Sequence, residues 1–142
     1  MTKQLQKIIH LINTGDLLST KIFSAIDIDS ALDKRDSGPF DSHWMSAFNE
    51  TESIYKKMAL NEQVIASINK IRELAFKAVK EAADSEIAAY VSDDFELIAK
   101  SVVINSTNLW VSALFSTYIS GNFPYGDLEP QGTEIAHLLT TA

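Results

Sequence analysis

Cysteine is absent from the 142 residues of this chain, and histidine occurs only three times, as His10, His43 and His137. Without cysteine there is no disulfide framework, no thiolate zinc site and no catalytic thiol. The histidines also lack the His-x-x-x-His spacing that places two ligands on one face of a helix. Because the usual acid–base and nucleophilic side chains are scarce, the sequence favours a protein that is not an enzyme, with no catalytic residue, no metal site and no cofactor.

Basic residues are almost missing from the last part of the chain. Residues 84–142 contain eight acidic residues and a single basic one, Lys100, whereas residues 1–40 contain five of each sign and residues 41–83 contain six of each. The whole formal net charge of −7 therefore lies in this acidic C-terminal region. Nucleic acids and anionic membranes both require clustered lysine and arginine, so we expect neither as a partner. A basic protein partner is compatible with the charge.

No apolar run has the character of a membrane span. The window 98–119 is long enough, but it contains Lys100, two asparagines, four serines and two threonines, and no basic flank marks a cytoplasmic side. The N-terminal apolar run is short and is interrupted by His10, which does not fit a signal peptide. The sequence thus predicts a cytoplasmic protein whose apolar residues, 46% of the total, form a buried core.

Strand patterns are missing as well, because the apolar residues recur with a helical period and no alternating runs are joined by a hairpin turn. We therefore predict an all-α fold, a single domain over residues 1–142 with a bundle of about six helices. The segment 108–120 is apolar nearly all round, which is typical of a central helix. The expected helical segments are 3–13, 16–26, a short piece after a bend near 27, 41–59, 61–82 with a continuation beyond a bend at 84–85, 93–104, 108–120 and a short segment from 133.

Residues with capping side chains predict where the helices begin. Gly15 and Gly121 are expected to end the helices before them, because glycine readily adopts the left-handed conformation. A narrow stripe of alanine and branched residues over 64–82 implies a closely packed neighbour and makes this stripe a candidate homodimer interface. The candidate caps are Asp16, Asp41 or Ser42, Asn61, Asp93 with Glu96 three residues later, and Ser106 or Thr107.

Three partial metal motifs each lack a required residue. Residues 134–137 (Glu-x-x-His) reproduce one half of a di-iron signature, which needs a second such pair and two further glutamates. The acidic stretch 92–96 lacks the third carboxylate that a magnesium motif places one turn later. The stretch 27–38 has Leu32 where a calcium loop needs glycine and Gly38 where it needs glutamate. Its aspartates are expected at a solvated helix edge, partly paired with the basic residues beside them.

The acidic C-terminal region also carries a loop near 121–132 that is rich in glycine and proline and bears aromatic residues. Aromatic anchors surrounded by charge are typical of a protein-binding surface. The alternative is that these aromatic residues fold back and cover the end of the bundle. The predicted partner-binding residues are Asp93, Asp94, Glu96, Phe123, Tyr125, Asp127 and Glu129.

Together these features favour a non-enzymatic protein-binding domain that engages a basic partner through its acidic C-terminal region. An immunity protein that neutralises a toxin, or a regulatory adaptor, would have this character. Two alternatives stay open. One is a homodimer through residues 64–82. The other is a small helical enzyme or small-molecule-binding protein with a pocket between bundle helices, walled by Trp44, Tyr55, Tyr90, Trp110 and Tyr118.

Overall fold

The computed structural model describes residues 2–24, 26–130 and 132–141, and this part of the chain contains helices and no strand. The prediction of an all-α bundle of about six helices is confirmed. The elements in chain order are α1 (Thr2–Thr14), the short 3-10 helix η1 (Thr20–Phe23), α2 (Ile28–Arg35), α3 (Gly38–Tyr55), α4 (Glu62–Ala82), α5 (Ser85–Val103), α6 (Leu109–Ile119) and α7 (Ile135–Thr141).

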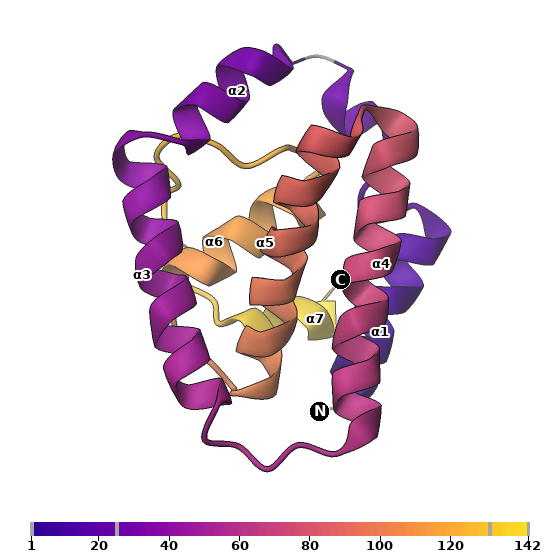
Figure 1. The fold of residues 1–142 in the computed structure, drawn as a ribbon, viewed down its shortest axis with the longest axis vertical. Helices are drawn as coiled ribbons and strands as arrows, with labels where there is room; N and C mark the ends of the chain where they lie inside the picture. The colour runs from indigo at the N-terminus through magenta and orange to yellow at the C-terminus, as the bar shows by residue number, and fades with distance from the viewer. Residues whose placement is uncertain (1, 25, 131, 142) are drawn as a thin grey trace.

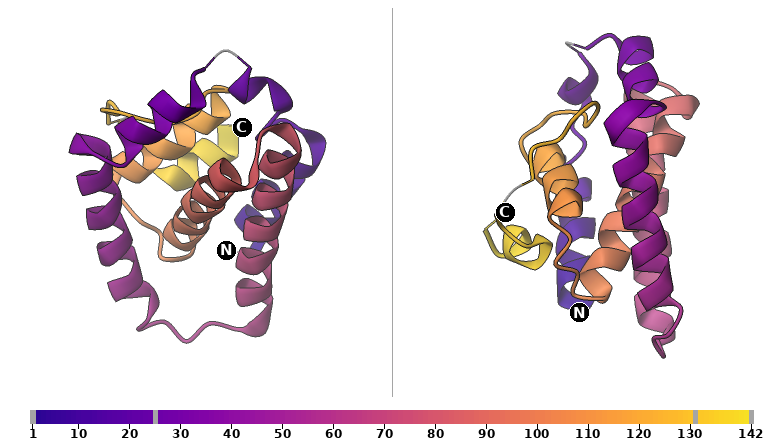
Figure 2. Two further views of the ribbon diagram at one scale, coloured as in Figure 1. Left: turned by 45° about the horizontal axis from the view of Figure 1, so that its top comes forward. Right: turned by 90° about the vertical axis from the view of Figure 1, so that its left-hand side faces the viewer.

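α5 occupies the centre of the bundle, with α3 on one side and α4 on the other (Figure 1). α2 lies across the end at which α5 begins, and α6 crosses behind α5. α1 packs along α4, and α7 contacts α1, α5 and α6. In the side view of Figure 2, α6 and α7 lie on one side of the molecule and α3 on the other, so that α5 is covered from several directions.

Side-chain caps fix where four of the α-helices begin. Asn61 accepts an amide hydrogen of the first turn of α4 at 2.9 Å, as predicted. Asp27 does the same for α2 at 3.2 Å, after the expected bend. Asp84 caps α5 at 2.9 Å. Asn108 accepts two amide hydrogens of α6, at 2.9 and 3.1 Å, and it takes the role predicted for Ser106 or Thr107.

The chain between α1 and η1 departs from the prediction. Gly15 has a φ of +82° and ends α1 as expected. Asp16 does not cap a helix, because its carboxylate accepts the Thr14 hydroxyl at 2.9 Å. Leu18 then has a φ of 59°, which lies outside helical geometry. The next helical turn is therefore only η1, and its cap is Ser19.

α3 begins at Gly38, before the predicted start near Asp41, and it ends at Tyr55 rather than near residue 59. Pro39 is accommodated in the first turn, where its missing N–H has no helical partner to lose. Ser37 precedes the helix in an extended conformation. The predicted break at 37–41 therefore lies just before Gly38, and Asp41 belongs to the first turn of the helix.

α4 and α5 form an antiparallel pair joined by a tight turn (Figure 1). Ala83 leaves the helical region with φ −140° and ψ −96°, so the predicted bend at 84–85 is a full break. Ala75 of α4 and Ala88 of α5 are both fully buried, which allows a close approach of the two helices. Asp93 and Glu96 lie in the middle of α5, so the predicted helix start at Asp93 is wrong.

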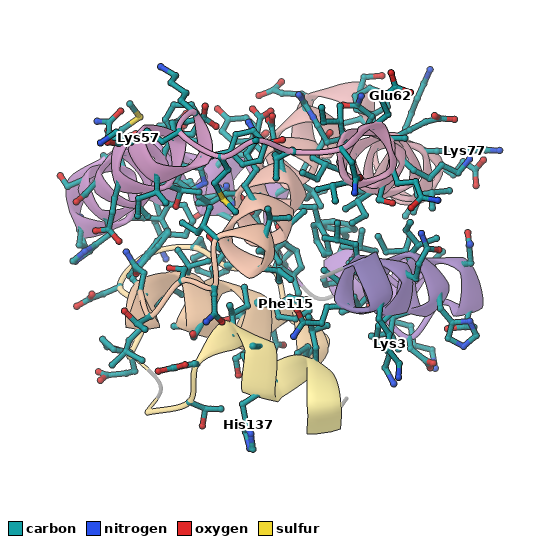
Figure 3. All side chains as sticks on the ribbon, turned by 90° about the horizontal axis from the view of Figure 1, so that it is seen from below. Lys3, Lys57, Glu62, Lys77, Phe115 and His137 are labelled. Atoms are coloured by element: carbon teal, nitrogen blue, oxygen red, sulfur yellow. The ribbon has the colours of Figure 1, made fainter. Side chains whose placement is uncertain are left out.

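The apolar segment predicted near 108–120 is α6, and its residues from Trp110 to Phe115 are buried without interruption. Viewed from below, Phe115 lies in the middle of the molecule, whereas Lys3, Lys57 and His137 lie at its periphery (Figure 3). Phe115 contacts Phe95 of α5 edge-on, with ring centroids 6.5 Å apart. No helix in the described residues has the length and apolarity needed to cross a lipid bilayer.

The stripe over residues 64–82 packs within its own chain. Its members Ile68, Ile71, Ala75 and Val79 are buried, and α4 makes its contacts with α5, α1 and η1. The close neighbour that the alanines imply is therefore α5. A homodimer through 64–82 stays a prediction.

Candidate functional site

A buried carboxylate, Asp94, lies at the point where most of the bundle meets. Its side chain is 0% exposed. Arg35 of α2 donates to both of its oxygens, at 2.7 and 2.8 Å. Trp44 of α3 donates its indole N–H at 2.9 Å, and Tyr118 of α6 donates its hydroxyl at 2.6 Å. Four donors therefore satisfy one carboxylate, as a buried charge requires.

Arg35 connects this carboxylate to the loop after α6. It is 4% exposed, and the Nη1 that binds Asp94 also donates to the carbonyl oxygen of Pro124 at 3.2 Å. Its guanidinium carbon lies 4.4 Å from the ring centre of Phe40 and 5.1 Å from that of Phe123, within the range of cation–π attraction. Burial by itself would lower the pKa of Arg35, but Asp94 raises it above its ordinary value, so the ion pair persists.

Tyr118 completes the buried cluster as a neutral donor. Burial and the negative charge of Asp94 raise the pKa of Tyr118 well above its ordinary value of 10.0. The phenol therefore keeps its proton and continues to donate to Asp94. The cluster joins α2, α3, α5, α6 and the loop at Pro124 through charge-assisted bonds, which are stronger than neutral ones.

A hollow of about 170 Å³ opens beside this cluster, between α2, α3 and α5. Its walls are aromatic or apolar, and three carboxylates belong to its lining. Tyr90 donates its hydroxyl to both oxygens of Asp36, at 2.9 and 3.1 Å, and burial together with Asp36 raises the pKa of Tyr90. The lining residues are Arg35, Asp36, Phe40, Asp41, Trp44, Met45, Tyr90 and Asp93.

A chain of ion pairs crosses from α4 to α3 over the surface of α5. Arg72 of α4 pairs with Asp93 at 3.2 Å and with Glu96 at 3.1 Å. Lys100 pairs with Glu96 at 3.0 Å and with Glu52 of α3 at 2.6 Å. Burial raises the pKa of Asp93, and Arg72 partly opposes this effect. Asp93, Asp94 and Glu96 of the acidic C-terminal region are therefore all paired with basic residues of the same chain.

The loop after α6 both covers the bundle and presents residues to solvent. Phe123 is 3% exposed and packs against Phe23 with ring centroids 5.6 Å apart, as the fold-back alternative predicts for it. Tyr125 is 36% exposed, and the Lys34 ammonium lies 5.4 Å from its ring centre. A shallow groove of about 340 Å³ runs beside it. Asp127 and Glu129 are exposed.

The family model for Immunity protein PIM1 matches residues 7–125. The chain belongs to this immunity protein family. No curated protein sequence matches the chain. The matched span runs from within α1 to the loop after α6, so it includes the whole Arg35–Asp94 cluster and every residue that lines the hollow. Asp127 and Glu129 lie just beyond it.

The seven residues predicted to bind a partner thus lie in three places in this immunity protein. Asp93 and Glu96 lie on α5 and pair with Arg72, and Asp93 also borders the hollow. Two are buried: Asp94 lies in the cluster with Arg35, and Phe123 packs on η1. Three belong to the loop surface. The buried pair is Asp94 and Phe123, and the loop residues are Tyr125, Asp127 and Glu129.

Of the five pocket walls that the small-molecule alternative predicts, two line the hollow, namely Trp44 and Tyr90. Tyr118 is inside the buried cluster, Trp110 packs edge-on against Phe40, and Tyr55 lies under the Lys100 ammonium at 4.6 Å. In the described residues, no group of three or more histidine or carboxylate side chains is arranged to hold a metal ion.

Arg35 is the functional-site residue that the sequence pattern placed wrongly. Flanking aspartates suggested a solvated helix edge, yet Arg35 shares the buried face of α2 with Ala31 and Leu32. Asp94 likewise lies on the apolar face of α5 that carries Val91 and Ile98, three residues before it and four after it. A charged residue in register with an apolar face is the signal that indicates a buried ion pair.

Proposed function

We propose that this immunity protein neutralises a toxin by binding it directly, and that the toxin presents a basic surface. The observation that carries the proposal is the family match over residues 7–125. The net charge of −7 supports a basic partner, because opposite charge speeds encounter and selects against wrong partners. The family match supports a role as an immunity protein, and the negative net charge supports a basic partner.

We place the contact on an acidic face formed by the rim of the hollow and the neighbouring loop. Arg35, which is 4% exposed, lies between these two parts, because it lines the hollow and also binds the Pro124 carbonyl beside Tyr125. Of the seven predicted residues, Asp94 and Phe123 are buried and would act by holding this face in place, and Glu96 is bound to Arg72 and Lys100. The residues of the acidic face are Asp36, Asp41, Asp93, Tyr125, Asp127 and Glu129.

The hollow is smaller than a typical binding site for a small metabolite. Ligand pockets enclose about 300–1,000 Å³, whereas this hollow holds about 170 Å³ and is open to solvent on one side. Such a space fits a protruding side chain of a partner better than it fits a cofactor or a drug-sized ligand.

Co-expression with the polypeptide encoded beside this chain in its genome tests the proposal. We expect that polypeptide to arrest growth alone, to be harmless with this chain, and to elute with it as one complex in size-exclusion chromatography. Calorimetric affinity should fall as the salt concentration rises, because screening weakens charge steering. Charge reversal by Asp127→Lys and Glu129→Lys should weaken the complex. Glu62→Lys, an exposed position at the far end of α4 (Figure 3), should not.

Absence of protection together with absence of a complex at low salt would refute the proposed role. A complex whose affinity is unchanged by salt and by both loop reversals would refute the acidic face as its location. Solution mass measured in the same chromatography tests the predicted homodimer, since a protomer of 15.7 kDa and a dimer of twice that mass separate readily.

A further inference from the structure

We infer that the hollow between α2, α3 and α5 is a socket for one cationic side chain, a lysine or an arginine, of the bound toxin. This inference rests on the proposed function and adds the chemistry of a single anchoring contact. Clustered carboxylates alone would not make a socket. Three further features of the same place, its concave shape, its aromatic walls and its local charge, point to the occupant.

The first feature is a concave space with room for a side chain. The hollow encloses about 170 Å³ between helices that the buried cluster holds in fixed positions. Trp44 forms one wall and donates to Asp94 at 2.9 Å, so its ring cannot swing freely to fill the space. Tyr90 forms another and is held by Asp36. A preformed site avoids part of the ordering cost of binding.

The second feature is the nature of the walls. Phe40, Trp44 and Tyr90 line the hollow with aromatic side chains. Phe40 is only 2% exposed, and the Arg35 guanidinium already lies over the rings of Phe40 and Tyr90, at 4.4 and 5.4 Å from their centres. The aromatic surface left for a further ammonium or guanidinium group is therefore that of Trp44 and the outer side of Tyr90. Met45 belongs to the same lining and is 44% exposed, which leaves an adaptable apolar contact at the rim for the aliphatic stem of a long basic side chain. A carboxylate-bearing occupant would gain nothing from these walls.

The third feature is the local charge. Arg35 is the one basic residue in the described lining, and its guanidinium is already bound in a fork to buried Asp94. Asp36, Asp41 and Asp93 remain around it. When Arg72, which pairs with Asp93, and Asp94 are included, four negative charges face two positive ones. A cationic occupant therefore meets a net negative charge around the hollow, which favours it over an anionic one.

The decisive experiment compares matched neutral variants in binding to the toxin. Asp36→Asn and Asp41→Asn each remove one rim charge, whereas Asp33→Asn removes the same charge from an exposed position on α2 outside the hollow. We expect each rim variant to raise the dissociation constant about tenfold, typical of losing one close charge pair, and the control to change it less than about twofold. Equal effects of Asp33→Asn and Asp41→Asn would overturn the socket.

A second measurement needs no toxin and separates the two proposals. N-acetyl-arginine methylamide, titrated into the 15N-labelled protein, should shift the indole signal of Trp44 in the millimolar range, and Asp41→Asn should abolish the shift. The citrulline analogue has nearly the same shape without the charge and should leave that signal in place. Equal shifts from both probes, or none from either, would overturn the socket. If the rim variants protected cells from the toxin as well as the wild-type protein does, the proposed immunity role would stand without the socket.

Discussion

Removal of the Asp94 carboxylate by the substitution Asp94→Ala is the sharpest test of how this fold is held together. Arg35 would then keep its charge while 4% exposed, with no anion beside it, and the donors of Trp44 and Tyr118 would lose their acceptor. Breaking a buried ion pair by removing one partner costs about 3–5 kcal/mol. Orphaning the two further donors adds to this cost, at roughly 1–3 kcal/mol each when no water replaces the carboxylate.

This loss is large against the whole stability of a domain of this size, which is about 5–15 kcal/mol. Urea denaturation followed by circular dichroism should show a lower midpoint, and the melting temperature should fall by at least roughly 10 °C, at about 2–4 °C per kcal/mol. Arg72→Ala is the control, because its pairs with Asp93 and Glu96 involve an arginine that is 40% exposed, and each pair should contribute no more than about 1 kcal/mol.

The double substitution Arg35→Met with Asp94→Leu separates loss of a charge partner from loss of packing. Because it removes both charges together, it should cost clearly less than Asp94→Ala, although Trp44 and Tyr118 still lack an acceptor. If Asp94→Ala cost about the same as Arg72→Ala, the cluster would not organise the bundle. If the double variant were as unstable as the single one, the cost would lie in packing or in the orphaned donors of Trp44 and Tyr118, and not in the isolated charge.

Two further predictions follow from the same contacts. Stability should fall as the pH rises above about 10, because burial and Asp94 raise the pKa of Tyr118 above its value of 10.0 in the unfolded chain. A raised folded pKa stabilises the protein fully below that pH and progressively less above it, so Tyr118→Phe should flatten this part of the alkaline unfolding profile; an unchanged profile would contradict the assignment. Asn108→Ala should cost about 1 kcal/mol in urea denaturation, because α6 loses the acceptor of two first-turn amides, and full retention of stability would show that the cap is dispensable.

Most of the helices can be predicted from the sequence, because the signals that define a helix are local. The period of apolar residues and the cap at Asn61 predict α4 closely, and the candidate caps Ser106 and Thr107 predict a helix start close to that of α6. Errors occur where neighbouring signals compete. Asp93 and Glu96 resemble a helix start, but Asp84 lies nearer to the break and takes the amide of the first turn. Asp16 resembles a cap, but it binds the Thr14 hydroxyl.

The charge pattern by itself predicts a basic partner, because net charge and its position along the chain need no coordinates. It could not show which carboxylates are buried and which are exposed. Asp94 and Asp93 are adjacent in sequence, yet one is buried against Arg35 and the other borders a hollow with Asp36 and Asp41. Only the tertiary structure decided this, because a helix turns neighbouring residues to different faces and distant segments determine which face is dry. The pairing of residues 35 and 94, 59 positions apart, is set by that packing and by no local signal.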